Sequence, residues 1–421
     1  MNKYFLIIAN LLKHELISGS FYLFVGGIFG SMAAFLLNLF LARTLSYENY
    51  GIYVSLLSLF TLLTIPAGSL TATIVRFAAG YFARDEIDKA STFYRKLIII
   101  WLLSGVALSI GTFMLAPLFT SFLHINNPLY ILIIGVCIGI SYFGVVNSAY
   151  LQSMTKFLYL SVITFFGNST RLIVGALLVL AGFGVRGALI GVFSTPFVIL
   201  VLGFIPLTFL FKRQEKKIQI DMREILSYSI PVVFGLISLS LFITTDTILV
   251  KHFFSPTLAG LYGGLSIVGK VIFYFTGMIP AVMFPLIVKK HTRGEEYKRI
   301  YLMAFLLIAI PSLLVTAVYF LFPDFVVKLF LGGHAYLGIV RYLGLYGIFI
   351  TIFSLLSLTV NFFLSIKKTA ISYLVFLFAV IQIVLIYFLH GSFYQVIYSS
   401  IFSVSLLLAI LLLYFYYTHR S

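Results

Sequence analysis

SPTLAGLY, residues 255–262, repeats a pattern that stands near the start of the chain as SYENYGIY, residues 46–53. Both copies have a serine, four residues, a glycine, one residue and a tyrosine. They lie 209 positions apart (255 − 46), almost half of the 421 residues. Each copy follows an apolar run that ends in a basic residue, Arg43 or Lys251, and another apolar run comes after it. A fixed internal period of this kind indicates a duplicated unit, here a membrane hairpin that occurs once in each of two similar lobes.

The composition is that of a membrane protein. Hydrophobic residues make up 62% of the chain and charged residues 10%, with a mean hydropathy of +1.12, whereas soluble domains carry about 25% charged residues. A spanning helix requires about 20 apolar residues. Twelve such runs can be counted, at 20–42, 52–79, 97–122, 129–152, 158–181, 187–211, 226–250, 260–288, 301–322, 336–363, 370–389 and 393–417. Backbone amides in lipid must be bonded within their own segment, and no run alternates like a barrel strand. We therefore predict an all-α polytopic membrane protein with about twelve transmembrane helices.

The net charge of +16 is explained by membrane topology. Four of the 28 Lys and Arg residues fall in one set of loops, namely Arg43, Arg186, Lys251 and Lys328. Twenty fall in the termini and the alternate loops: Lys3, Lys13, Arg84, Lys89, Arg95, Lys96, Lys156, Lys212, Arg213, Lys216, Lys217, Arg223, Lys289, Lys290, Arg293, Lys298, Arg299, Lys367, Lys368 and Arg420. Because basic residues are retained on the cytoplasmic side, we expect a multi-pass protein of the cytoplasmic (inner) membrane with both termini in the cytoplasm. No nucleic acid partner is needed to explain the charge.

The predicted spans divide into two six-helix lobes, 1–211 and 226–421, joined by a charged cytoplasmic linker at 212–225. Pro117 near the end of the third span has a counterpart in Pro323, 206 positions on (323 − 117), which supports the duplication. Six spans is an even number, so both lobes insert in the same direction, in the parallel-repeat arrangement of some transporters. The single cysteine, Cys137, reads as a packing residue. The first residues are too short and too broken by charge to span, and we interpret them as a helix on the inner surface, not a signal peptide.

Charged residues inside the spans are the candidates for function, because a charge in mid-membrane costs at least about 2.5–3.5 kcal/mol. Arg171 lies midway along the fifth span and Lys270 lies well inside the eighth. One comes from each lobe at similar depth, so we predict that both face a shared central cavity. Arg76 and Arg341 lie near span ends and can reach the interface by snorkelling, so a structural and a substrate-binding role are both open for them.

Asp246 is the only carboxylate inside a predicted span. Lys251, five residues away, is a poor helical partner for it, so an ion pair with another helix and a coupling-ion or proton site are both open. With four cations against one anion, the cavity is predicted to attract anions. Arginine and lysine suit phosphate, whereas an exporter of organic cations would need acidic groups.

Other motif-like matches do not indicate chemistry. Residues 264–271 resemble a phosphate-binding loop, but the position after Lys270 holds Val271 where Ser or Thr would bind Mg²⁺, and the match lies inside a span. The seven histidines lack metal-ligand spacing, and no nucleophile or acid–base set can be assembled. We expect no enzyme activity, no metal and no cofactor.

The sequence resembles a known family. The positions that carry the resemblance are Leu36–Ser46, Tyr50–Tyr53, Val75–Phe77, Asp246–Val250, Gly260–Tyr262 and Lys270. They look like the hairpins of polysaccharide repeat-unit flippases (Wzx type), of the multidrug/oligosaccharidyl-lipid/polysaccharide exporter superfamily. The resemblance implies a MATE-like fold of two six-helix bundles that open alternately to the two sides. It also implies transport of an undecaprenyl-diphosphate-linked oligosaccharide, for O-antigen, capsule or another polymer, and it carries over Arg43, Arg76, Asp246 and Lys270 as functional positions.

We thus predict a flippase in which Arg171, Lys270, Arg43, Arg76 and Arg341 meet the diphosphate and Asp246 serves coupling or an ion pair. The expected partners are the lipid-linked oligosaccharide, membrane lipids, and the polymerase and glycosyltransferases of the same pathway. Two alternatives are an ion-coupled exporter of small organic cations and a non-transporting scaffold for glycan-polymerising enzymes.

Overall fold

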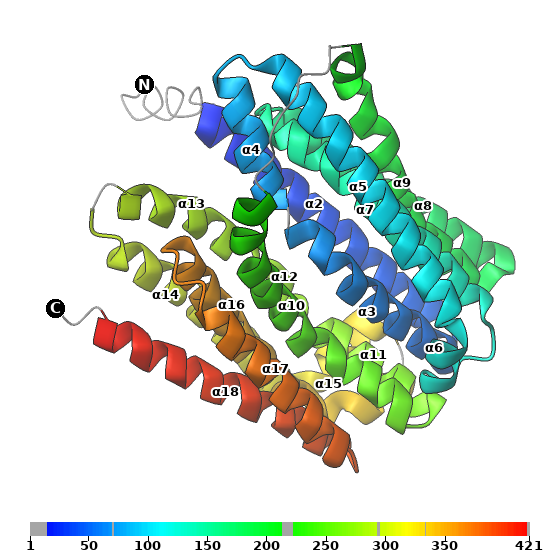
Figure 1. Ribbon diagram of the computed structural model, residues 1–421. Helices are drawn as coiled ribbons and strands as arrows, with labels where there is room; N and C mark the ends of the chain where they lie inside the picture. Colours follow the sequence, from blue (N-terminus) through cyan, green and yellow to red (C-terminus); the bar gives the residue numbers. More distant parts are fainter. Residues whose placement is uncertain (1–14, 70, 213–221, 293–294, 333, 419–421) are drawn as a thin grey trace, which may run out of the picture. The chain divides into compact units, whose positions relative to one another are not determined.

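The computed structural model describes residues 15–69, 71–212, 222–292, 295–332 and 334–418. Every regular element in these ranges is a helix (Figure 1). The α-helices are α2 (Glu15–Thr44), α3 (Tyr47–Ser69), α4 (Thr71–Ala83), α5 (Ile87–Met114), α6 (Ala116–Phe122), α7 (Leu129–Ser153), α8 (Phe157–Leu178), α9 (Gly184–Phe204), α10 (Met222–Phe253), α11 (Pro256–Gly269), α12 (Val271–Thr276), α13 (Met278–Thr292), α14 (Lys298–Leu321), α15 (Pro323–Leu331), α16 (Val340–Ser365), α17 (Ile371–Phe388) and α18 (Phe393–Thr418). The short helical turns are η1 (Val179–Phe183), η2 (Ile205–Lys212) and η3 (His334–Ile339). The predicted surface helix and most of the predicted linker lie outside the described residues.

Ten helices among the described residues are long and apolar enough to cross a membrane, so this is a multi-pass membrane protein. They cover Tyr47–Gly68, Ile87–Met114, Leu129–Ser153, Phe157–Lys212, Val233–Phe253, Pro256–Thr276, Lys298–Leu321, Tyr336–Ser365, Ile371–Phe388 and Phe393–Thr418.

The difference from twelve has a physical basis. The stretch Phe157–Lys212 is 56 residues long and contains two predicted spans. Its helix turns back at η1, where Gly182 and Gly184 have positive φ angles of 89° and 52°, which glycine adopts readily. Beyond the turn α8 and α9 pack side by side, so closely that a Cβ on Gly191 would lie 2.6 Å from Gly175 Cα. In the first predicted span only Met32–Thr44 counts as an apolar helix. The number twelve stays a prediction.

The chain divides by its contacts into two compact units. Unit 1 takes in the described parts of Met1–Asn38, Pro66–Ser121 and Asn126–Ser229; unit 2 takes in Leu39–Ile65, Phe122–Ile125 and Ile230–Ser421. Most of α3, which belongs to the predicted first lobe, is therefore packed within unit 2. The lobe boundaries themselves stay a prediction.

Unit 1 is built around α5, α7, α8 and α9, which run alongside one another (Figure 1). Asn147 on α7 is fully buried and links neighbouring helices. It accepts a hydrogen bond from the Tyr94 hydroxyl at 2.8 Å and donates to the Leu200 carbonyl at 3.3 Å. Cys137, also on α7, is fully buried, and burial fits the predicted packing role. Polar links of this kind fix one helix against another where the surroundings supply little hydrophobic driving force.

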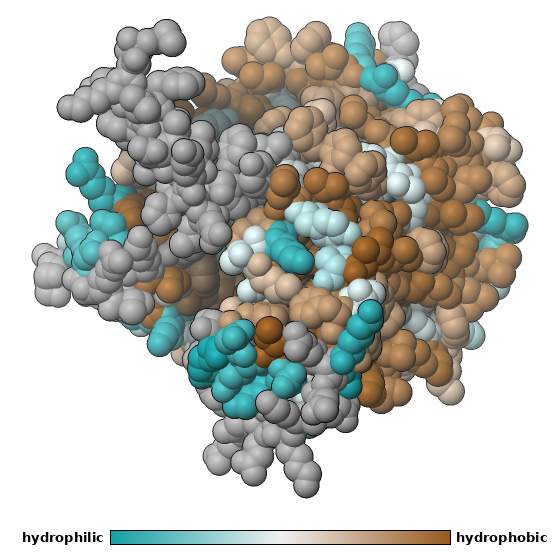
Figure 2. All heavy atoms as spheres, turned by 90° about the horizontal axis from the view of Figure 1, so that it is seen from above, coloured by the Kyte–Doolittle hydropathy of each residue, from teal (hydrophilic) through white to brown (hydrophobic). Residues whose placement is uncertain are grey.

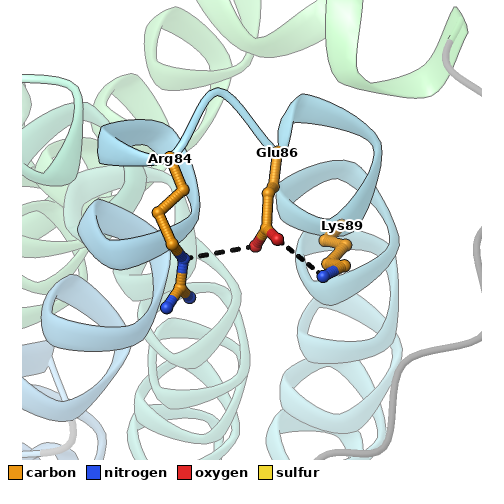
Figure 3. A network of polar contacts seen from close by, with 3 residues as sticks. All are labelled: Arg84, Glu86 and Lys89. Atoms are coloured by element: carbon orange, nitrogen blue, oxygen red, sulfur yellow. Dashed lines mark hydrogen bonds and ion pairs between the residues drawn. The ribbon is translucent and has the colours of Figure 1, made fainter.

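The charged loop between α4 and α5 forms a small surface network (Figure 3). Glu86 accepts a hydrogen bond from Lys89 Nζ at 2.7 Å and lies 3.4 Å from Arg84 Nε. The hydrogen bond from Lys89, helped by the charge of Arg84, lowers the pKa of the Glu86 carboxyl. Arg84 and Asp85 form a turn, with Asp85 at a φ of 57°, and α5 begins directly after Glu86 at Ile87.

The surface reflects the membrane setting. Hydrophobic side chains cover much of the face shown in Figure 2, and hydrophilic ones are gathered in small groups. Large exposed apolar side chains recur along α5, α14 and α17, among them Leu103, Leu314 and Phe388. Apolar residues that face outward in this number are expected of helices whose solvent is lipid.

Unit 2 is arranged around α16, which packs against α11, α12, α13, α14 and α18. Most of its residues from Tyr342 to Ser365 are buried. Helix α16 is therefore a central element, and it lies next to the interrupted helix formed by α11, α12 and α13. This interrupted helix carries the second copy of the repeated pattern.

Candidate functional site in unit 2

Both serines of the repeated pattern lie at the starts of helices. Ser255 Oγ accepts a hydrogen bond from Leu258 N at 3.4 Å at the N-terminus of α11, and Pro256 occupies the first helical position. Ser46 Oγ accepts one from Asn49 N at 3.3 Å at the N-terminus of α3. Serine is a preferred N-cap because its oxygen satisfies an unpaired backbone N–H. The pattern thus specifies where each of the two helices begins.

The glycines of the two copies lie against each other. A Cβ on Gly51 would be 2.8 Å from Gly260 N, and a Cβ on Gly260 would be 1.9 Å from the Tyr47 carbonyl oxygen. Helices α3 and α11 therefore cross backbone to backbone, at equivalent positions of the repeat. Small residues permit this close approach of helices in membranes.

Contacts near the start of α3 hold this crossing in place. The guanidinium of Arg43 donates to the carbonyls of Leu329 at 2.5 Å and Phe330 at 3.1 Å, at the C-terminus of α15. Those carbonyls have no partner within the helix, so Arg43 acts as a helix cap. The Tyr336 hydroxyl donates to the Ala42 carbonyl at 3.2 Å.

Asp246 on α10 is fully buried and accepts four hydrogen bonds. Its Oδ2 accepts from the hydroxyls of Tyr262 at 3.0 Å and Tyr346 at 2.8 Å. Its Oδ1 accepts from the backbone N–H of Thr247 at 2.7 Å and from the Thr247 hydroxyl at 3.3 Å. The Tyr346 hydroxyl also lies 3.1 Å from Ser266 Oγ. The carboxylate therefore connects α10, α11 and α16.

Lys270 lies at the break between α11 and α12, and its side chain is half-buried. Gly269, the residue before it, makes room for Tyr346, since a Cβ there would lie 2.1 Å from the Tyr346 ring. The glycines that resemble a phosphate-binding loop in sequence thus serve packing: Gly269 admits the Tyr346 ring, and Gly264 lies against the ring of Tyr336.

The other basic residue near Asp246 in sequence takes a different place. Lys251 is 1% exposed and lies in the last turn of α10. The next residue, His252, approaches the Phe122 carbonyl at 2.6 Å through Nδ1 and stacks on the Phe122 ring. Lys251 is thus a buried residue of unit 2, although its position in the sequence suggested a loop charge.

The remaining predicted site residues are spread over the chain. Arg171 lies half-buried on α8, beside the contact between Gly175 and Gly191. Arg171 belongs to unit 1 and Lys270 to unit 2, so their meeting in one cavity stays a prediction. Arg341, on α16, is exposed, with its guanidinium 4.8 Å from the centre of the Tyr342 ring. Arg76 lies on α4, and its side chain is outside the described part of the structure.

Sequence reasoning missed the tyrosines that hold Asp246. Tyr262 is the last residue of the repeated pattern, so a signal existed for it. Tyr346 had none, because a tyrosine in an apolar helix does not reveal whether its hydroxyl meets a partner. Among the residues that the structure describes, no group of three or more His, Cys, Asp or Glu could hold a metal ion.

Comparison with solved structures defines the fold. It is similar to that of an inward-facing multidrug resistance MATE family transporter of the MOP superfamily, with a TM-score of 0.71 and 15% identity over 91% of this chain and 94% of that one. It is also similar to the lipid II flippase MurJ in an inward closed conformation, with a TM-score of 0.70 and 15% identity over 96% of this chain and 88% of that one. The chain therefore shares its fold with these two proteins.

Sequence comparison identifies the family. The family described as "Polysaccharide biosynthesis protein" matches residues 16–291, more than half of the chain. The protein belongs to this family, and the resemblance drawn from its sequence is confirmed. It is also 25% identical over 292 residues to the uncharacterized membrane protein MJ1375 of Methanocaldococcus jannaschii, covering 65% of this chain and 68% of the relative.

Proposed function

We propose that the protein is a flippase that moves an undecaprenyl-diphosphate-linked oligosaccharide repeat unit across the cytoplasmic membrane by alternating access. The observation that carries the proposal is Lys270, a half-buried cation at a helix break inside a membrane span. A cation at such a place marks a substrate or ion pathway by default. Membership of a polysaccharide biosynthesis family supports a glycan substrate.

The diphosphate is the chemical feature that the cationic residues fit. Lysine binds phosphate as a point charge, and arginine binds it through two parallel hydrogen bonds. In the proposal Lys270 and Arg171 are the main residues that meet the headgroup, and Arg43, Arg76 and Arg341 are further cationic positions that do so. For Arg43 the cap that it provides to α15 limits how far its guanidinium can turn to a ligand without loosening that contact.

The likeness to the lipid II flippase MurJ supports the proposal that the substrate is linked to a lipid. In the proposed cycle the glycan and diphosphate cross through a water-filled space while the polyprenyl tail stays in the bilayer. Both termini lie in the cytoplasm, and the transported unit is used for O-antigen, capsule or another surface polymer.

The alternative, an ion-coupled exporter of small organic cations, is favoured by the likeness to a multidrug transporter. Such an exporter needs an accessible carboxylate for its substrate. Asp246 is fully buried, and four donors already occupy its two oxygens. The position of this carboxylate supports the anionic substrate.

The test is flipping in vesicles that contain only the purified protein. A fluorescent undecaprenyl-diphosphate oligosaccharide is placed in both leaflets, and a membrane-impermeant reductant quenches the outer pool. A flippase makes nearly all of the fluorescence accessible, whereas about half stays protected in empty vesicles. In parallel, ethidium-loaded vesicles test export of an organic cation.

Lys270→Gln provides the site-specific arm of this experiment, and Lys328→Gln, an exposed lysine on α15, is the matched control. The expected result is slow flipping for Lys270→Gln and normal flipping for Lys328→Gln. Ethidium efflux without lipid flipping would overturn the proposal in favour of the cation exporter.

A further inference from the structure

The carboxylate of Asp246 is fixed and fully enclosed. Two tyrosine hydroxyls and two groups of Thr247 donate to it, from α10, α11 and α16. It has no exposed surface. A buried charge of this kind destabilises a protein strongly when it lacks an opposite charge nearby. A cation in its vicinity is therefore expected.

Lys270 provides that cation without a direct contact. The Tyr346 side chain connects the two residues, because its hydroxyl donates to Asp246 and its ring lies against Gly269, the residue before Lys270. Within the described ranges no hydrogen bond or ion pair joins the Lys270 ammonium to another residue. Its side chain is half-buried. The N–H donors of the Lys270 ammonium thus remain available to a ligand, although the carboxylate of Asp246 balances its charge without direct contact.

We infer that Asp246 is the counter-ion of Lys270 and sets how tightly this lysine holds an anionic headgroup. The inference rests on the proposed function and assigns Asp246 a tuning role in it, instead of a coupling-ion site. A phosphate that binds Lys270 is attracted by the ammonium and repelled by the buried carboxylate behind it. Repulsion limits the affinity, so the headgroup can leave again after it has crossed.

The two tyrosines hold the Asp246 carboxylate in place, so its repulsion of a bound phosphate does not vary. Tyr262 and Tyr346 both donate to Oδ2 of Asp246, which keeps the carboxylate turned toward their hydroxyls. Gly269 lets the Tyr346 ring reach this place directly beside Lys270 in sequence. A flexible carboxylate would instead follow the ammonium and compete with the substrate for its donors.

The test measures the affinity of undecaprenyl diphosphate for the full-length protein in nanodiscs, with undecaprenol as the uncharged comparison. Asp246→Asn is expected to bind undecaprenyl diphosphate roughly tenfold tighter, because removal of a nearby like charge in a protein interior has an effect of this order. Undecaprenol affinity is expected to stay the same. Asp324→Asn, an exposed carboxylate on α15, is the matched control and is expected to change neither.

Transport kinetics distinguish tuning from a purely structural role. Asp246→Asn is expected to lower both KM and kcat for flipping, since tighter binding slows release. A structural role would lower kcat without tighter binding. If Asp246→Asn does not yield folded protein, the double variant D246N/K270Q is compared with K270Q. The double variant removes both charges, so no unpaired charge is left buried. The double variant is expected to bind undecaprenyl diphosphate more tightly than K270Q does.

The outcomes separate the inference from the function on which it rests. If Lys270→Gln weakens binding at least tenfold but removal of the Asp246 charge changes nothing, the counter-ion role is wrong and the flippase site stands. If Lys270→Gln leaves both binding and flipping unchanged, the proposed headgroup site is itself wrong.

Discussion

Gly260→Ala tests whether the crossing of α3 and α11 contributes to stability. The added Cβ would lie 1.9 Å from the Tyr47 carbonyl oxygen, 2.5 Å from its carbon and 2.9 Å from Tyr47 Cα. Ordinary contact begins at 3.4 Å, so the two backbones must separate by 1.5 Å (3.4 − 1.9) to accept one methyl group. All three neighbours are backbone atoms, so no rotamer change can relieve the clash.

The expected loss is at the upper end of the 1–3 kcal/mol that overpacking typically costs, thus about 3 kcal/mol. Gly263→Ala, on the same helix, is the matched control, because its Cβ would meet Val54 at an ordinary 3.4 Å. Alanine is also the better helix former by about 1 kcal/mol, so this control is expected to be neutral or slightly stabilising.

Thermal unfolding of the purified protein in detergent measures both variants. We expect a clear fall in the midpoint for Gly260→Ala and none for Gly263→Ala. Gly51→Ala addresses the same contact from α3, so its effect is expected to be smaller than additive when combined with Gly260→Ala. Equal midpoints for Gly260→Ala and Gly263→Ala would refute the view that the crossing is close-packed in the folded protein.

Three further predictions concern polar contacts. Tyr346→Phe removes one donor from the buried carboxylate of Asp246 and is expected to destabilise the protein by about 1–3 kcal/mol; Tyr342→Phe, on the same helix and without a hydrogen bond among the described residues, should leave the unfolding midpoint unchanged. Arg43→Gln is expected to lower the midpoint because the carbonyls at the end of α15 lose their cap, and an unchanged midpoint would show that the cap is not stabilising. For Glu86, whose folded-state pKa is lowered, the network stabilises the protein above the unfolded-state value of about 4.3 and not below the folded-state pKa. The small difference in midpoint between the wild type and Glu86→Gln should therefore vanish as the pH falls through the lowered folded-state pKa of Glu86, and a constant difference would contradict this origin.

The sequence predicted much of the helical architecture because hydropathy and charge determine what a span is. The repeated pattern also indicated where two helices begin, since a serine cap is a local device. It did not indicate that Gly51 and Gly260 meet each other. Apolar helices all look alike in hydropathy, so which of them are neighbours depends on shape complementarity, which single positions do not reveal.

Only the charged residues of the candidate site could be predicted from the sequence. Asp246 and Lys270 stand out because charge is rare in spans, whereas Tyr346 becomes visible only once Gly269 brings its ring under α11. Arg43 and Lys251 were read as loop charges, but the structure uses one as a helix cap and buries the other. Counting basic residues by loop predicts orientation and says nothing about what each side chain touches.

The contact between Gly51 and Gly260 has a consequence for the origin of the protein. In a symmetric dimer, equivalent residues of the two copies touch each other at the two-fold axis. A half-length ancestor with one SxxxxGxY pattern would have met a second molecule of itself at this glycine, as a homodimer. If the predicted duplication took place, gene fusion would then have turned a contact between subunits into one within a chain.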